Sequence, residues 1–161
     1  MKQSGFYKLS WRYIYLVKDC GGTYKDDKER PIYCCIQDRD CADIYWAIPT
    51  STISNRTSAQ LNRIKMLCDL PDRDIRSCYY HIGHTNRPAI YKISNALPIT
   101  ESFINSEYIS QGSHLILRDK KLIAELKRKL SRILFDEKRH PNKYEQHISS
   151  LYAYLKGEFT F

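Results

Sequence analysis

The sequence predicts an α+β fold, in which a small, mostly antiparallel sheet or barrel is accompanied by helices. Short apolar runs bounded by turn residues predict strands. Segments with apolar residues at helical spacing lie between them, and the C-terminal part consists of two amphipathic helices. A chain of 161 residues is long enough for one domain with a real core, and we expect a single domain over residues 1–161.

The N-terminal half alternates helices with short strands. Residues 5–9 form a short apolar segment, and strands are predicted over residues 32–36 and 43–48, joined as a hairpin by the polar turn 38–40. Ser10 can cap a helix that ends at Cys20-Gly21-Gly22, and the charged stretch 23–30 predicts a solvated loop. A second helix is expected over residues 58–70, because Leu61, Ile64 and Leu67 recur at helical spacing and Pro71 stops it.

The C-terminal half begins with strands and ends in helices. Strands are predicted over residues 78–82 and 89–93, a short helical segment from Pro98, and a last strand over 113–117. One apolar stripe then predicts a long helix, carried by Leu122, Ile123, Leu126, Leu130, Ile133 and Leu134. After Pro141 a further helix can bury Ile148, Leu151, Tyr152 and Leu155.

The hydroxyl cluster Thr50-Ser51-Thr52 follows the apolar run 44–49, which Pro49 closes. A buried strand that ends at this proline leaves the next side chains free to face a ligand. Hydroxyls at a strand exit can hold a phosphate. The alternative is that these residues build a turn or cap the helix near Leu61.

Charge favours an anionic partner. The formal net charge is +8 and the isoelectric point is near 9.2, which suits RNA, DNA or a membrane surface. The sequence holds no apolar stretch of bilayer-spanning length and no signal-like N-terminus, so we expect a cytoplasmic protein with no membrane partner. Its six cysteines show no Cys-x-x-Cys ligand spacing, which favours buried free thiols over a zinc site or disulfides.

Basic side chains are concentrated on one face of the first terminal helix. This predicted RNA-binding face comprises Lys120, Lys121, Lys127, Arg128, Lys129 and Arg132. A phosphate backbone would bind there, although a single lysine-rich helix is often an ordinary solvated face. The chain also has thirteen tyrosines, and aromatic rings that stack on unpaired bases favour single-stranded RNA over duplex DNA.

The segment His81-Ile82-Gly83-His84 spells the signature of class I aminoacyl-tRNA synthetases. Its context excludes that function, because the signature belongs after the first strand of a large doubly wound domain. His84 at a strand end could still act as a general acid or base, or serve as a surface turn residue.

Several common enzyme motifs are missing from the sequence. It contains no Gly-rich phosphate loop, no G-x-S-x-G elbow, no H-E-x-x-H and no carboxylate cluster spaced to hold magnesium. We therefore expect no metal and no cofactor. One reaction on RNA needs neither: a 2′-hydroxyl attacks the adjacent phosphorus and leaves a cyclic phosphate and a 5′-hydroxyl. The protein must then orient the nucleotide and neutralise developing charge.

A succession of short segments resembles the toxins of type III toxin-antitoxin systems, the ToxN, CptN and TenpN group. The segments are Phe6-Tyr7 with Ser10 and Tyr13-Ile14, Arg30-Pro31-Ile32-Tyr33, Ile48-Pro49-Thr50-Ser51, and Ala96-Leu97-Pro98-Ile99. The Thr-Ser pair and the length suit the CptN-like branch best. The resemblance covers most of the chain in order, and the C-terminal helices match it in character.

This resemblance implies a compact MazF/PemK-like β-barrel with added helices, acting as a sequence-selective endoribonuclease. It also implies an RNA antitoxin, a small folded pseudoknot cut from a repeat precursor, which inhibits the toxin within a protein-RNA assembly. Carried over by position, Thr50 and Ser51 match an active-site hydroxyl pair, Tyr13 matches a helix tyrosine beside the site, and Arg30 stands where the family has a catalytic lysine.

Arginine at position 30 matters because it binds phosphate in a bidentate way and does not release a proton. Lys28 could take its place, and His84, Lys92 or Ser51 could transfer protons. Thr52 and the basic helix would contact RNA. The alternative function is a non-catalytic module that binds structured RNA, and a protein-protein interaction domain is a third possibility.

Overall fold

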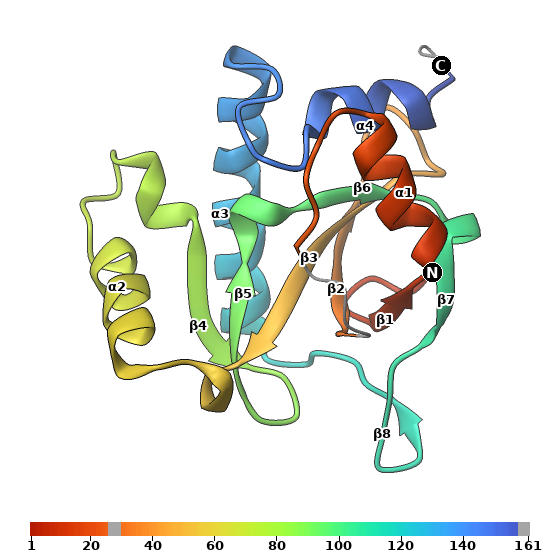
Figure 1. Cartoon of the computed structure of the whole chain (residues 1–161). Coiled ribbons are helices and arrows are strands. Elements are labelled where there is room, and N and C mark those ends of the chain that lie inside the picture. Colours follow the sequence, from red (N-terminus) through yellow and green to blue (C-terminus); the bar gives the residue numbers. More distant parts are fainter. Residues whose placement is uncertain (26–29, 158–161) are drawn as a thin grey trace.

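The computed structural model describes residues 1–25 and 30–157, and Figure 1 shows how its elements are arranged. The strands are β1 (Phe6–Leu9), β2 (Ile32–Gln37), β3 (Tyr45–Thr52), β4 (Tyr80–His84), β5 (Pro88–Lys92), β6 (Leu97–Ile99), β7 (Ile104–Glu107), β8 (Ile109–Ser110) and β9 (Ser113–His114). The helices are α1 (Trp11–Asp19), α2 (Ser58–Cys68), α3 (Lys120–Arg139) and α4 (Ile148–Leu155), with 3-10 turns η1 (Ile53–Asn55), η2 (Ile75–Cys78), η3 (Ile93–Asn95) and η4 (Glu101–Phe103).

The main sheet is antiparallel and open. Its strand order is β4-β5-β3-β2-β1-β7, with β6 paired to β3, and β8 and β9 form a separate hairpin. The predicted α+β class with a mostly antiparallel sheet is confirmed. The MazF/PemK-like barrel is not, because β4 and β7 are the sheet edges and no pairing joins them within the described part of the chain.

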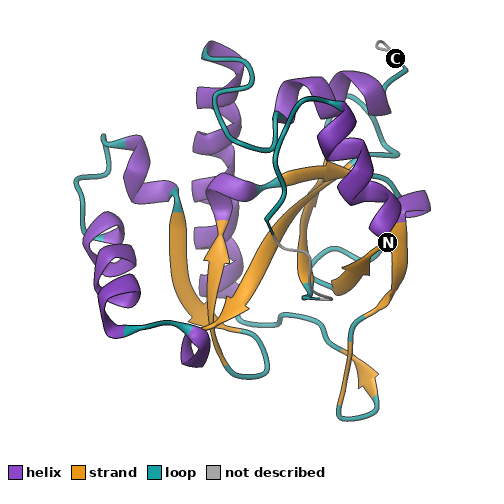
Figure 2. Ribbon diagram, viewed as in Figure 1, coloured by secondary structure: helices purple, strands orange, loops and turns teal. Residues whose placement is uncertain are grey.

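Helices cover both faces of the sheet (Figure 2). Successive side chains of a strand point to opposite faces, so each strand can supply apolar side chains to both layers of helices. Tyr33 and Ile48 lie in the core that α3 covers through Leu126 and Leu130. Their strand neighbours Ile32, Cys34 and Ala47 lie in a second core with Tyr13, Leu16 and Val17 of α1 and Leu151 of α4. Successive residues of β2, and of β3 as far as Ile48, therefore supply opposite cores, which is why these stretches are apolar at consecutive positions.

Strand β3 does not end at Pro49 as the sequence predicts, but continues to Thr52. Before the proline it pairs with β2 on one edge and with β6 on the other, and after it Thr50, Ser51 and Thr52 pair with β5. The Thr50 N–H points to β2, where it donates to the Pro31 carbonyl. Successive N–H groups of a strand point to alternate edges. The Pro49 nitrogen, which carries no proton, therefore points to the edge opposite β2, at the place where the partner strand changes from β6 to β5. The proline therefore interrupts no ladder bond.

The predicted helices form, with local signals as expected. The Ser10 hydroxyl accepts from the Arg12 N–H at the start of α1, and Thr57 and Gln60 form a capping box on α2. The segment after Pro98 differs, because residues 97–99 form β6 before the short turn η4. The last predicted strand shrinks to β9 and a bridge between Gly5 and Ile116, while β7 and β8 have no clear sequence signal.

All six cysteines are free thiols, and Cys20, Cys34, Cys35 and Cys78 are buried. None of the helices within the described ranges combines the length and the apolar character needed to cross a membrane.

Candidate nucleic-acid interface

A cleft of about 210 Å³ opens where the end of β3 meets the turn between β4 and β5. Residues from four separated stretches of chain line it: Arg30 and Pro31; Thr50, Ser51, Thr52 and Asn55; Thr85, Asn86, Arg87 and Ala89; and Tyr108. The register Thr52↔Ala89 brings the 85–87 turn beside the hydroxyl cluster. Among the described residues that line the cleft are two arginines and no carboxylate. An anion would therefore meet favourable charge and no opposing side chain.

Thr50 lies at the cleft but its hydroxyl is already engaged. The side chain is 2% exposed, and its Oγ1 donates to the Pro31 carbonyl oxygen over 2.8 Å. The Thr50 backbone N–H donates to the same oxygen over 3.3 Å. With its only proton committed to Pro31, this hydroxyl holds the segment that carries Arg30 and does not donate into the cleft.

Ser51 has the opposite arrangement. Its Oγ accepts a hydrogen bond of 3.1 Å from Nη2 of Arg56. A guanidinium has donors and no acceptor, so the Ser51 oxygen is the acceptor and its own proton remains available. The side chain is buried at 5% exposure and lines the cleft. Arg56 thus orients a hydroxyl that can donate to a bound oxyanion.

Arg30 and Arg87 supply the charge of the cleft. Arg30 is half-buried just before β2, and Arg87 is exposed in the β4–β5 turn. Arg56 and Arg87 were not expected from the sequence. The signal for Arg87 lies in the pairing of β3 with β5, which brings residues far apart in the chain around one space. Arg56 is only five residues from Ser51 and is placed by the short turn η1. Asn86 in the same turn donates from Nδ2 to the Ser110 Oγ over 3.0 Å, which links the turn to β8.

Tyr13 is not brought to the cleft. It is fully buried in the second core, and its hydroxyl donates to the Pro98 carbonyl. Burial raises the pKa of this phenol well above its ordinary value. The expected role beside the site therefore does not fit its position, because α1 turns this face onto the sheet. Its ring meets Phe103 edge-on at 5.3 Å between centroids.

The remaining proton-transfer candidates lie elsewhere. His84 is exposed at the end of β4, where its Nε2 lies 3.1 Å from Oδ2 of Asp119, the N-cap of α3. The hydrogen bond to this carboxylate raises the pKa of His84. Lys92 is half-buried on β5 opposite Tyr80. Neither His84 nor Lys92 lines the cleft. Lys28 lies outside the described residues.

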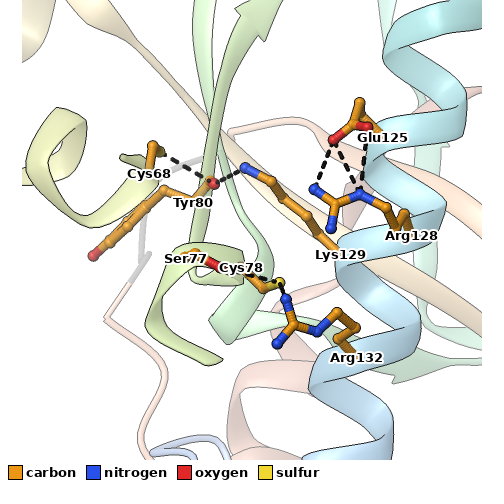
Figure 3. A network of polar contacts seen from close by, with 8 residues as sticks. All are labelled: Cys68, Ser77, Cys78, Tyr80, Glu125, Arg128, Lys129 and Arg132. Atoms are coloured by element: carbon orange, nitrogen blue, oxygen red, sulfur yellow. Dashed lines mark hydrogen bonds and ion pairs between the residues drawn. The ribbon is translucent and has the colours of Figure 1, made fainter. Parts of the chain in front are cut away.

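The basic helix is only partly a solvent face. Lys129 is 6% exposed and donates from Nζ to the Tyr80 carbonyl over 2.9 Å, the same oxygen that the Cys68 thiol contacts (Figure 3). Nη1 of Arg132 donates to the Cys78 sulfur over 3.3 Å. Lys129 follows Leu122 by seven residues and Leu126 by three, so helical geometry turns it inward. Lys129 therefore lies inside the fold, which does not fit the prediction that it contacts RNA, whereas Arg132 is half-buried and its contact with RNA stays a prediction.

Other members of the predicted face remain accessible. Lys120, Lys121 and Lys127 are exposed on α3. Arg128 is exposed but pairs with Glu125, with Nη2 and Oε2 2.9 Å apart. Of the six residues of the predicted RNA-binding face, the three exposed lysines can therefore bind a polyanion without breaking the ion pair between Arg128 and Glu125.

A second depression, here called the groove, has a volume of about 640 Å³. It lies against α2 and the η2 turn, and its lining comprises Lys25, Arg56, Gln60, Arg63, Ile64, Leu67, Arg76, Tyr79, Tyr80, Ser94, Asn95, Lys143, Tyr144 and Glu145. Arg56 lines the groove while its Nη2 bonds to Ser51 of the cleft. Arg56 therefore belongs to both places, because it lines the groove and contacts Ser51 of the cleft.

Comparisons with known proteins give little guidance. No protein-family model and no curated protein matches the chain. A similar solved structure is described as "A processed non-coding RNA regulates a bacterial antiviral system", with a TM-score of 0.42 and 14% sequence identity over 97% of this chain and 89% of that one. Both values are too low for this likeness to indicate a function. In residues 1–25 and 30–157, no group of three or more His, Cys, Asp or Glu side chains could hold a metal ion.

Proposed function

We propose that the chain is a metal-independent endoribonuclease toxin of a type III toxin-antitoxin system. The observation that carries the proposal is the Ser51 hydroxyl, fixed through its oxygen by Arg56 and set in a cleft with Arg30 and Arg87. A pentavalent phosphorane has more negative charge on its non-bridging oxygens than the ground state has. Prepositioned donors and cations at this point stabilise the transition state preferentially.

In the proposed reaction the RNA 2′-oxygen forms a bond to phosphorus and the bond from phosphorus to the 5′-oxygen breaks. A water molecule would take the proton of the 2′-hydroxyl and solvent would return one to the departing 5′-oxygen, leaving a 2′,3′-cyclic phosphate and a 5′-hydroxyl. Arg30 and Arg87 would neutralise the phosphoryl oxygens, and Ser51 would donate a hydrogen bond to one of them. Thr50 would act indirectly, by holding Pro31 and so Arg30. Tyr108 also lines the cleft, and its ring would contact the bound RNA.

The resemblance of the sequence to type III toxins implies how the enzyme would be regulated. A small folded RNA antitoxin, processed from a repeat precursor by the toxin itself, would inhibit cleavage by occupying the cleft. The exposed lysines of α3, Lys120, Lys121 and Lys127, would bind the body of that RNA. Cellular messenger RNA would be the substrate once the antitoxin is lost.

One observation favours a second candidate, a non-catalytic RNA-binding module. The described lining of the cleft holds arginines, hydroxyls and amides, and no histidine, lysine or carboxylate to accept the 2′-proton. Arginine does not serve as the acceptor. Such a cleft would bind phosphate firmly even if it did not cut RNA.

Cleavage of a mixed RNA pool in EDTA separates these functions. Wild-type protein should give discrete products with cyclic phosphate ends, and Ser51→Ala should lose about 100- to 1,000-fold in rate, as removal of one oxyanion donor does. Ser54→Ala is the matched control, because Ser54 is exposed nearby and does not line the cleft. RNA that is bound but stays whole, in EDTA and in magnesium, would support the binding module.

A further inference from the structure

We propose that the groove binds the unpaired nucleotides that flank the phosphate in the cleft, and that Arg63 and Tyr80 set which RNA is cut. This inference rests on the proposed function, whose reacting phosphate it extends to the neighbouring residues of the strand. The volume of about 640 Å³ falls in the range of about 300–1,000 Å³ that holds nucleotide-sized or drug-sized ligands. One or two nucleotides would fill it.

The unbalanced charge of the groove comes from α2 and the segment before it. Of the cations that line it, Lys25 pairs with Glu145, Arg76 with Asp74 and Lys143 with Asp136, at 3.3, 2.7 and 2.7 Å. Arg63 is exposed, and within the described residues no hydrogen bond or ion pair engages it. Its guanidinium is thus available for a phosphate, without loss of an existing contact.

Aromatic rings line the same space. Tyr79 and Tyr80 are both half-buried at the start of β4 and line the groove. The Tyr80 carbonyl is held between Lys129 and Cys68, and Figure 3 shows its ring directed away from α3. Tyr79 is packed edge-on against Tyr144, with centroids 5.9 Å apart. Tyr80 is therefore the ring best placed to stack on an unpaired base, since its backbone is fixed from both sides.

Arg56 makes the cleft and the groove one path. It lines the groove and bonds to the Ser51 Oγ, so a strand whose phosphate meets Ser51 leads directly to the space beside Arg63. A duplex would not fit this arrangement, because its bases are stacked on each other and their faces are closed to Tyr80. The groove therefore selects single-stranded RNA and can discriminate the base beside the cut.

The test measures binding of labelled 2′-O-methyl RNAs of increasing length, which lack the attacking hydroxyl and stay whole. The variants are Arg63→Gln and Tyr80→Leu, and their controls are Arg39→Gln in the β2–β3 turn and Tyr15→Leu, whose ring is 57% exposed on α1. Circular dichroism and the unfolding midpoint establish that each variant folds. We expect each groove variant to bind six-nucleotide RNA about tenfold more weakly than wild type, with dinucleotide affinity unchanged. Arg63→Gln should also reduce the salt dependence of binding by about 0.7 in the logarithmic slope.

The outcomes separate the two proposals. Groove variants that bind every length as the controls do would overturn the groove inference, as would a base-paired hairpin that competes as well as single strands. If length-dependent binding is lost in the groove variants but wild type cuts no RNA, the groove stands and the nuclease fails. If RNA is cut and the groove variants alter neither affinity nor cut positions, the nuclease stands and the groove fails.

Discussion

Thr50 and Ser51 are neighbours in sequence but have opposite hydrogen-bond roles, and Thr50→Val tests this difference. Valine keeps the shape of the side chain and removes the hydroxyl that donates to Pro31 over 2.8 Å. The Pro31 carbonyl still accepts from the Thr50 backbone N–H, so no buried acceptor is left alone. The cost is then that of one neutral hydrogen bond, about 1 kcal/mol.

For a chain of this size a loss of about 1 kcal/mol lowers the melting temperature by about 2–4 °C. Urea unfolding followed by tryptophan fluorescence measures the loss of free energy of unfolding, because Trp46 is 7% exposed and stacks on Tyr152 in the folded protein. The urea slope should stay unchanged. A variant as stable as wild type would mean that the bond to Pro31 contributes nothing.

Activity gives the sharper result. If Thr50 only positions Pro31, Thr50→Val should reduce kcat/KM for RNA cleavage by less than about tenfold, against about 100- to 1,000-fold for Ser51→Ala. Thr50→Ser, which retains the hydroxyl, should cut at nearly the wild-type rate. A Thr50→Val protein that is folded but as inactive as Ser51→Ala would refute the assignment and make Thr50 a direct donor to phosphate.

Three further outcomes are expected. Lys129→Met should leave the free energy of unfolding, measured in urea, within about 1 kcal/mol of wild type, since the loss of a bond to a carbonyl is offset by no longer burying an ammonium. Lys127→Met should instead weaken RNA binding and lower its salt slope, measured by anisotropy at several salt concentrations; equal slopes would remove this lysine from the interface. Burial, with Lys129 nearby, lowers the pKa of His81 to about 4. Its neutral form is therefore favoured in the fold, and stability should be complete near pH 7 and fall as the pH drops from about 6.5 towards 4. His81→Asn should flatten that part of the pH profile in urea titrations, and an unchanged profile would contradict it. His84 acts in the opposite direction, because its carboxylate partner raises its pKa and its contribution to the stability of the protein therefore grows as the pH falls. The pH profile of His81→Asn is therefore compared with that of the wild type, in which His84 is also present.

Local signals predicted the elements well. The Ser10 cap, the end of α2 before Pro71 and the hairpin around residues 38–40 depend on neighbouring residues only, and each is present. The extension of β3 past Pro49 could not be predicted locally, because it depends on β5 replacing β6 as partner. The inward position of Lys129 was predictable, since it has the spacing of the apolar stripe.

The candidate site was predictable only in part. Arg30, Thr50 and Ser51, which the resemblance assigns to the site, line one cleft together with Thr52, and their roles in it stay predictions. Tyr13 was assigned by position in a motif, and position alone does not tell which face of α1 meets the sheet. Arg87 escaped notice because strand register, a long-range property, sets its distance from Ser51. The contact of Arg56 with Ser51 depends instead on the path of the short turn η1 between them.

The four stretches that line the cleft are far apart in sequence, so an anion bound there would connect β2, β3, the β4–β5 turn and Tyr108. An unfolded chain cannot present these groups together, and binding would therefore add directly to the free energy of unfolding. At a free ligand concentration a hundred times the Kd, the gain is about 2.7 kcal/mol. A chain occupied by RNA would thus also be the one that resists proteases, and release of the RNA would leave the protein both accessible and shorter-lived.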